Sequence, residues 1–308
     1  MFGKKDSKKV ILRPHNLEGE GFDLLVVDAA ADQRLELVSF WSDPDSIMKN
    51  SLRSVVKEYG LKNNHTVVVL PHSSYSHFTM NRPNVPQEEI RDSLFWASQE
   101  KLDSLPYFSP ILDSCFAPDL LKGREHNKMH VFVAEESHVR SCVDSVRKSG
   151  LKVDSVTVHE VAASALLAKW SSGVLCAYLD IPIDSSPSLI LVLNGDFVAY
   201  KKLPSINTNS AVDVQRDQFS LFFGEVARQL TYFSNCLDEN YTIKIYGSGE
   251  NWHKLIKNSL FRSVFAQRFP NHELGSLDLS QIVNIDGVDS NMLRYMQHDL
   301  LGGALAYE

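Results

Sequence analysis

The chain has 308 residues, of which 44% are hydrophobic and 22% are charged, and this is an ordinary globular composition. Its length suggests about two domains, with a core large enough to be stable without disulfides or structural metals. The net charge of −7 and the pI near 5.9 argue against a nucleic-acid-binding surface. We expect the basic start, with Lys4, Lys5, Lys8 and Lys9, to be a solvated flexible terminus, with contact to an anionic membrane as the alternative.

The cysteines are far apart and form no CxxC motif, so we expect mostly buried, reduced thiols at Cys115, Cys142, Cys176 and Cys236. No apolar run approaches the roughly 18 residues of a membrane span. The opening MFGKKDSKKV lacks the hydrophobic region of a secretory signal. We therefore expect a cytosolic protein, or one held at a membrane by something else.

The first part of the chain has the order strand, strand, helix, strand. Strand-like apolar runs cover Phe22–Val27, Leu35–Phe40 and Thr66–Leu70. A helix is expected between the last two runs, because Pro44 stands where a first turn would begin and apolar residues recur at helical spacing before Gly60. This order predicts an α/β layer.

A self-contained β-α-β-β-α unit follows at about residues 71–150. Its predicted strands cover residues 74–80, 108–116 and 129–134. The first helix opens at Pro86 and places Ile90, Leu94 and Ala97 on one face. The second helix covers residues 137–148 and should end at Gly150.

After the strand at 151–158 and the helix EVAASALLAKW, the chain takes on a hairpin texture. VLCAYLDI, SLILVL and DFVAYKKL are predicted strands, and Asn194-Gly195 between the last two is a strong hairpin signal. A long helix, the strand TIKIYG, a helix through Leu255 and a closing helix in GGALAYE complete the chain. Each half shows a hairpin, a helix and a strand, and clefts between such duplicated halves often hold ligands.

Several segments in this order carry a family resemblance. They are KMHVFVAEESHVRSCVDSVRKSGLKVDSVTVHEVAASALL, LDIPIDSSPSLILVLNGDFVAYKKL and the terminal LLGGALAYE. From about Gly21 to Glu308 the chain resembles the actin-like ATPase superfamily, and within it the PilM/MshI-like pilus biogenesis proteins. The resemblance implies an α/β actin-like (ribonuclease H-like) fold with duplicated halves. The first half is expected at 1–170, with the inserted subdomain at about 71–150. The second is expected at 171–308, its last helix packing back towards the first half.

The resemblance also implies a nucleotide site with two phosphate-binding hairpins. In VVDAAAD, Asp28 matches the aspartate of the first hairpin, and Ala30 stands in place of its glycine. Asp28 is then either a strand-end residue or a ligand of Mg²⁺-bound water. An alanine there adds a Cβ and restricts positive φ, so the backbone approaches a phosphate less closely.

The second hairpin should read Asp-Ile-Gly, and here Asp180 is followed by Ile181 and Pro182. The proline removes a backbone N–H that could face a phosphate. Ser185 and Ser186 are hydroxyl donors or ordinary turn residues, and Gly247 and Gly249 form the adenosine-side turn or a tight strand-to-helix connection.

These changes predict a degenerate site with no catalytic residue and no cofactor, or with ATP and Mg²⁺ bound weakly. A metal site is not expected, because the histidines, including His72, His77, His130 and His159, show no ligand spacing. Whether the protein is an enzyme stays open, with domain closure by an ATP-binding actin-like ATPase as the alternative function.

The leading interpretation is a cytoplasmic scaffold, peripheral to the bacterial inner membrane, in the assembly complex of a type IV, MSHA-like pilus. The resemblance implies that it binds the short N-terminal cytoplasmic tail of a bitopic membrane protein, with the assembly ATPase as a further partner and no nucleic acid. The groove for this tail is expected near residues 66–70, 74–80 and the helix from Pro86. A type II secretion L-type cytoplasmic domain is a third interpretation.

Overall fold

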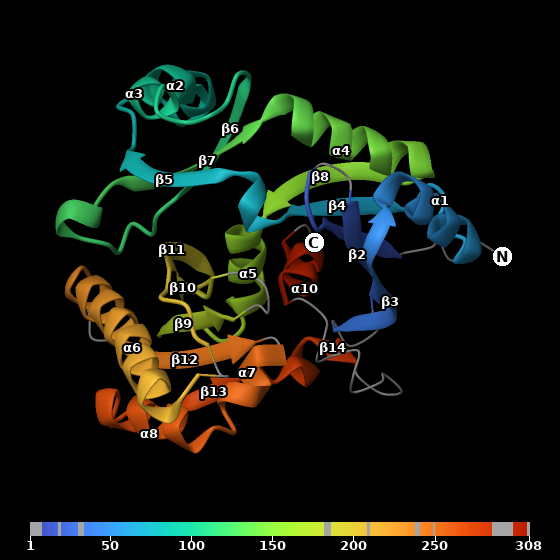
Figure 1. The fold of residues 1–308 in the computed structure, drawn as a ribbon. Coiled ribbons are helices and arrows are strands. Elements are labelled where there is room, and N and C mark those ends of the chain that lie inside the picture. Colours follow the sequence, from blue (N-terminus) through green and yellow to red (C-terminus); the bar gives the residue numbers. More distant parts are fainter. Residues whose placement is uncertain are drawn as a thin grey trace.

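The computed structural model describes residues 8–17, 20–29, 34–181, 186–207, 210–237, 241–248, 250–284 and 298–306. It contains two large sheets, with a pair of helices between them, and a small three-stranded sheet at one end (Figure 1). Ala30, Pro182, Ser185 and Gly249, which the sequence singles out, lie outside the described residues.

The first large sheet has the order β14-β3-β2-β1-β4-β8. Strands β1, β2 and β3 pair antiparallel in sequence, whereas β4 and β8 are parallel to β1, and β14 adds to the outer edge of β3. Apolar side chains of β1 and β4 are completely buried, which explains why these strands form the centre. The bounds are β1 Lys9–Pro14, β2 Glu20–Ala29, β3 Leu35–Ile47, β4 His65–Leu70, β8 Lys152–Val158 and β14 Val283–Asn284.

The second large sheet, β11-β10-β9-β12-β13, repeats this arrangement, with two antiparallel pairings followed by two parallel ones. Strand β9 therefore corresponds to β1, and β12 to β4. The predicted hairpin at Asn194-Gly195 is confirmed, since both residues have positive φ, as a type I′ turn requires. The bounds are β9 Val174–Asp180, β10 Ser188–Leu193, β11 Asp196–Lys202, β12 Thr242–Ser248 and β13 Leu274–Ser276.

Two predictions near the start of the chain are wrong. Lys9 does not belong to a flexible terminus, because it begins β1 and its Nζ donates a hydrogen bond to Ala304 O at 2.9 Å. The helix begins at Met48 and not at Pro44, which lies inside β3. In the described ranges, β14 pairs with β3 only at Leu35 and Glu36, so no second strand there needs the N–H that Pro44 lacks.

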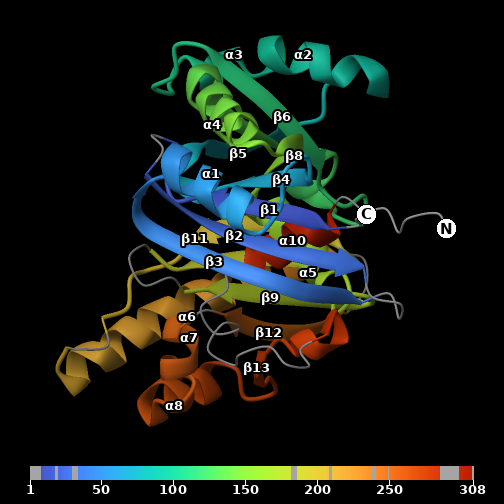
Figure 2. The ribbon, with the colours of Figure 1, turned by 90° about the vertical axis from the view of Figure 1, so that its right-hand side faces the viewer.

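Helices α5 (His159–Leu167) and α10 (His298–Leu305) lie between the two large sheets (Figure 2). Helix α10 packs on β1, β2 and β4 of the first sheet, and α5 packs on β10 and β11 of the second. Small residues allow this sandwich: a Cβ on Gly302 would lie 1.8 Å from Ala162 O, and a Cβ on Gly303 would lie 2.8 Å from Val69. The two helices thus join the halves.

Other helices cover the outer faces of the two halves. Helix α6 has an aromatic stripe that packs against α8 in the second core, as its spacing predicts. Helix α4 ends at Gly150 with a φ of 105°, and this confirms the predicted cap. The bounds are α1 Met48–Glu58, α4 Glu136–Ser149, α6 Val212–Asn235, α7 Glu250–Leu255 and α8 Ser259–Arg268.

The small sheet has the order β5-β7-β6 and its own core under α2, where Ile90 and Leu94 are buried. Helix α4 was expected in this unit. Its buried residues Val139, Cys142 and Val146 instead belong to the first core, and the helix packs against α1. Ala97 is exposed. The bounds are β5 Ser76–Asn81, α2 Ile90–Ala97, α3 Gln99–Leu102, β6 Pro110–Phe116 and β7 Lys128–Glu135.

Within the described part of the chain, no helix has both the length and the apolar character to span a bilayer. Cys142 and Cys176 are buried and Cys115 and Cys236 are half-buried, all four as free thiols.

The contact between Gly302 and α5 gives a stability test. We expect Gly302→Ala to lower the free energy of unfolding by at least about 2 kcal/mol, because the added methyl group meets backbone that cannot yield. Gly224→Ala on α6 is the matched control: its Cβ would meet only Arg268 Nη2, at 3.8 Å, so stability should stay equal or rise by up to about 1 kcal/mol. Urea unfolding measures both, and equal losses would contradict the close packing.

Candidate functional site

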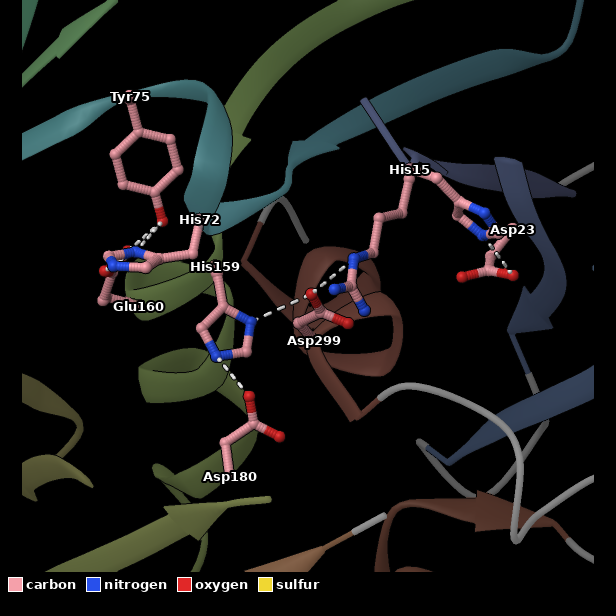
Figure 3. A network of polar contacts seen from close by, with 9 residues as sticks. His15, Asp23, His72, Tyr75, His159, Glu160, Asp180 and Asp299 are labelled. Atoms are coloured by element: carbon pink, nitrogen blue, oxygen red, sulfur yellow. Dashed lines mark hydrogen bonds and ion pairs between the residues drawn. The ribbon is translucent and has the colours of Figure 1, made fainter. Parts of the chain in front are cut away.

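Charged side chains from four elements meet between the two large sheets. Arg13 comes from β1, His159 from α5, Asp180 from the end of β9 and Asp299 from the first turn of α10. His159 Nδ1 lies 3.0 Å from Asp299 Oδ2, and His159 Nε2 lies 3.5 Å from Asp180 Oδ2 (Figure 3). Arg13 Nε lies 3.5 Å from the same oxygen of Asp299. We call these four residues the cleft network.

The cleft network shifts the pKa values of its members. Burial alone would lower the pKa of His159, but its hydrogen bond to Asp299 and the charges of Asp299 and Asp180 raise it to about 9. Burial would raise the pKa of Asp299, but Arg13 and His159 lower it to about 2. At neutral pH, Arg13 and His159 are therefore cations and Asp299 is an anion. Burial raises the pKa of Asp180, although His159 and Arg13 oppose this shift.

Helix α10 adds to the stabilisation of Asp299. The helix runs antiparallel to β1, so that Asp299 at its first turn faces Arg13 and Ala304 at its last turn accepts a hydrogen bond from Lys9. A carboxylate at the start and an ammonium at the end are both favourable to a helix dipole. The helix is therefore held to the first sheet by a charged contact at each end.

Glu160, next to His159 on α5, is completely buried and has partners of its own. His72 Nδ1 lies 3.0 Å from Glu160 Oε1, and the hydroxyl of Tyr75 donates to Oε2 (Figure 3). Burial would raise the pKa of Glu160, but the hydrogen bonds and charges around it lower that pKa. Its environment therefore favours the ionised carboxylate.

A further buried acid, Asp23 on β2, is also paired. His15 Nε2 lies 3.2 Å from Asp23 Oδ1, and Ser42 donates a hydrogen bond of 2.6 Å to the same oxygen. Both acids beside the cleft network therefore have polar partners from the chain itself. Among the described residues, no group of three His, Cys, Asp or Glu side chains is placed to hold a metal ion.

A groove of about 520 Å³ lies between the first large sheet and the small sheet. Its lining is mostly apolar, with Arg91 from α2 and Asp113 from β6 as the two charged side chains. Leu70, Tyr75 and Arg91 come from segments where the sequence predicts a groove. Most of the lining comes from β6, β7 and β8, which were not predicted to form it: Ile111, Leu112, Ser114, Cys115, Phe132, Val133, Ala134, Val156, Thr157 and Val158.

Two sheet edges border this groove. Strand β8 is the last strand of the first sheet, and β6 is the last strand of the small sheet. Within the described residues each pairs with only one neighbour, β8 with β4 and β6 with β7. A free strand edge presents unpaired N–H and C=O groups that can pair with an added strand.

The sequence matches no protein-family model and no curated protein. Its structure is similar to the PilM-PilN type IV pilus biogenesis complex, with a TM-score of 0.66, 16% identity and 98% coverage of both chains. It is also similar to a protein with an actin-like ATPase fold and unknown function from Bacteroides thetaiotaomicron, with a TM-score of 0.51, 10% identity and coverage of 92% and 95%. The cytoplasmic domain of EpsL, an inner membrane component of the type II secretion system of Vibrio cholerae, gives a TM-score of 0.47 at 12% identity, with coverage of 98% and 96%. A TM-score of this size does not support a comparison of function.

The chain has the actin-like fold. These identities establish the fold and nothing finer. In this fold the duplicated halves each begin with a strand and a hairpin, and the sheet orders match β1 with β9. The first hairpin of the actin-like fold is therefore the one between β1 and β2, not the one between β2 and β3.

This topology corrects the placement of Asp28. Val27 lies opposite Lys9, at the start of β1, and Asp28 lies one residue beyond it. Arg13 stands four residues further along β1, which is about 13 Å in a strand. Asp28 is thus at the other end of the first sheet from the cleft network. From the sequence, Asp28 is assigned to the phosphate site because β1 is missed and β2 is counted as the first strand.

The other predicted site residues are likewise divided between the cleft network and positions outside it. Asp180 belongs to the cleft network, and Gly247 lies on the neighbouring strand, opposite Leu179. Packing explains Gly247, since a Cβ there would lie 2.2 Å from the indole ring of Trp252. Ser186 is exposed, two residues before β10.

The described residues do not fit a Mg²⁺-nucleotide as the resemblance implies it. The strand that should deliver an aspartate to the first phosphate hairpin ends with Arg13 and Pro14. The guanidinium of Arg13 lies against Asp299, and its charge also acts on Asp180. A second cation, His159, stands between the two carboxylates. Arg13, His159 and Asp299 were missed because nothing in their local sequence marks a site.

The raised pKa of His159 predicts a dependence of stability on pH. A folded-state pKa of about 9, above the ordinary 6.5, gives a stabilisation that is complete below about pH 6.5 and is lost as the pH rises through 9. The loss should reach about 3 kcal/mol, since one pKa unit is worth about 1.4 kcal/mol. Unfolding free energies of the wild type and His159→Gln between pH 6 and 10 test this. A parallel decline in both proteins would show that His159 is not the titrating group.

Proposed function

We propose that the protein is a cytoplasmic scaffold of a type IV pilus assembly complex at a bacterial inner membrane. In this role it binds the short N-terminal tail of a bitopic, PilN-like membrane protein. The observation that carries the proposal is the groove bordered by the free edges of β6 and β8. The likeness to the PilM-PilN complex over 98% of both chains supports it. We further propose that the pilus is MSHA-like and that the assembly ATPase is a second partner.

The groove suits a short extended peptide. A peptide beside β6 or β8 could form main-chain hydrogen bonds with a free edge, while alternate side chains enter the apolar lining. Phe132, Ala134 and Val158 supply apolar surface, and Arg91 and Asp113 can fix direction and register through one charge of each sign. This division of labour gives affinity through the backbone and selectivity through the side chains.

In this proposal the protein works by binding and not by turning over a nucleotide. The cleft network supports that choice, because cations of the chain already face Asp180 and Asp299. The alternative is an ATP-binding protein that closes on its ligand, and it has Asp180 and Gly247 on neighbouring strand ends in its favour.

The groove can be tested with the tail of the PilN-like protein from the same bacterium, fused to a carrier. We expect Ile111→Glu to weaken binding at least tenfold, or about 1.4 kcal/mol, because Ile111 lines the groove and a carboxylate there would lose water. Val38→Glu is the matched control: Val38 is 44% exposed and Ile111 is 37% exposed, both stand on strands, and Val38 does not line the groove. Biolayer interferometry measures both affinities.

No binding of the wild type at high micromolar tail concentration would count against the scaffold proposal. An equal loss of affinity in Ile111→Glu and Val38→Glu would show that the tail does not bind in this groove. Circular dichroism and thermal unfolding of each variant establish that the fold is intact before binding is compared.

A further inference from the structure

The cleft network crosses the boundary between the two halves of the fold. Arg13 belongs to the first sheet and Asp180 to the second, at the ends of the two strands that the duplication makes equivalent. His159 and Asp299 stand between them on the sandwiched helices α5 and α10 (Figure 3). A chain of opposite charges thus runs from one sheet to the other: Arg13, Asp299, His159, Asp180.

Neighbouring ionisable groups do not compete for these contacts. Glu160 is paired with His72 and Tyr75, and Asp23 is paired with His15 and Ser42. His298, beside Asp299 on α10, is half-buried and stacks on Tyr178, and the loss of water around its ring lowers its pKa to about 4, so it is neutral at pH 7. Among the described residues, the cationic side chains in contact with Asp180 and Asp299 are therefore Arg13 and His159, while His72 acts on Asp180 from further away.

We propose that Arg13 and His159 form a built-in cationic clasp that holds the two halves of the fold closed without a bound ligand. The clasp supplies, from the chain itself, the positive charge that the two carboxylates of the cleft need. The clasp proposal depends on the proposed function at one point, namely that the protein acts by binding and not by nucleotide turnover. The closed arrangement is then the resting state of the molecule.

The physical basis is the asymmetry of buried ion pairs. Removing one partner leaves an uncompensated buried charge, which is strongly destabilising, whereas removing both partners together can be nearly neutral. Asp299 has no exposed side-chain surface, so the loss of Arg13 leaves His159 as its one charged partner among the described residues. A double-mutant cycle on Arg13 and Asp299 therefore tests the clasp: coupled residues give non-additive losses of stability, and independent residues give additive ones.

The experiment compares Arg13→Gln, Asp299→Asn, the double variant Arg13→Gln/Asp299→Asn, and the charge-keeping control Arg13→Lys. Thermal unfolding and hydrogen exchange of α10 are measured for each. We expect Arg13→Gln to lower the Tm by roughly 10 °C and to speed exchange in α10 at least ~10-fold, because the helix loses its charged contact with β1. The double variant should be more stable than Arg13→Gln, and Arg13→Lys should stay close to the wild type. Exchange in α2, whose buried residues Ile90 and Leu94 lie in the separate core of the small sheet, should not change.

Two results would overturn the clasp. One is a double variant whose Tm loss equals the sum of the two single losses, since that shows no coupling between Arg13 and Asp299. The other is a Tm of the wild type that rises by several degrees with millimolar Mg²⁺-ATP, since the cleft then takes an external ligand. Should Arg13→Gln fail to fold, a double variant that is more stable than Asp299→Asn would still show coupling between Arg13 and Asp299. Arg13→Lys would still show whether the positive charge is what matters. Tail binding is measured separately, so a failed groove and a failed clasp give different results.

Discussion

The arrangement of the whole molecule depends on how charges are compensated inside it. Arg13, His159 and Asp299 carry charge in a region that two sheets and two helices shield from water. Charged groups in such a place are tolerated only when partners of opposite sign lie close by. This requirement fixes the end of β1, the first turn of α10 and the start of α5 relative to one another, and through them the two sheets.

The groove and the cleft network are physically connected. Tyr75 lines the groove, and its hydroxyl is bonded to Glu160, the neighbour of His159 along α5. Glu160 is in turn paired with His72, whose ring lies against Tyr200 of β11, with centroids 4.3 Å apart. A continuous set of polar and aromatic contacts therefore leads from the peptide-sized groove, past the boundary between the halves, to the second sheet.

Much of the fold follows from local patterns. The alternation and apolar runs of β9, β10 and β11, the Asn194-Gly195 turn and the Gly150 cap were all predictable, because each depends on a few adjacent residues. The strand β1 was not, since its apolar run, Val10–Leu12, is short and follows a cluster of lysines. Pro44 misled for a related reason: proline is found both at helix starts and at exposed strand edges.

The candidate site was predictable only in part. Asp180 was found because a strand-end aspartate follows a strong hairpin pattern. Asp28 was misplaced as soon as β1 was missed, since every later strand then moved by one position in the sheet. The partners of Asp180 could not be read from the sequence, because Arg13, His159 and Asp299 are separated by more than a hundred residues and meet only through the sheet topology.

The free edges of β6 and β8 also matter for how the protein is made. Two strand edges next to an apolar lining can pair with strands of other chains, and at high concentration they favour aggregation of copies of the same chain. A cell gains from producing such a protein in balance with whatever covers the edges. Under the proposed function, the groove would therefore link the solubility of the protein, and hence its abundance, to the supply of the tail that covers it.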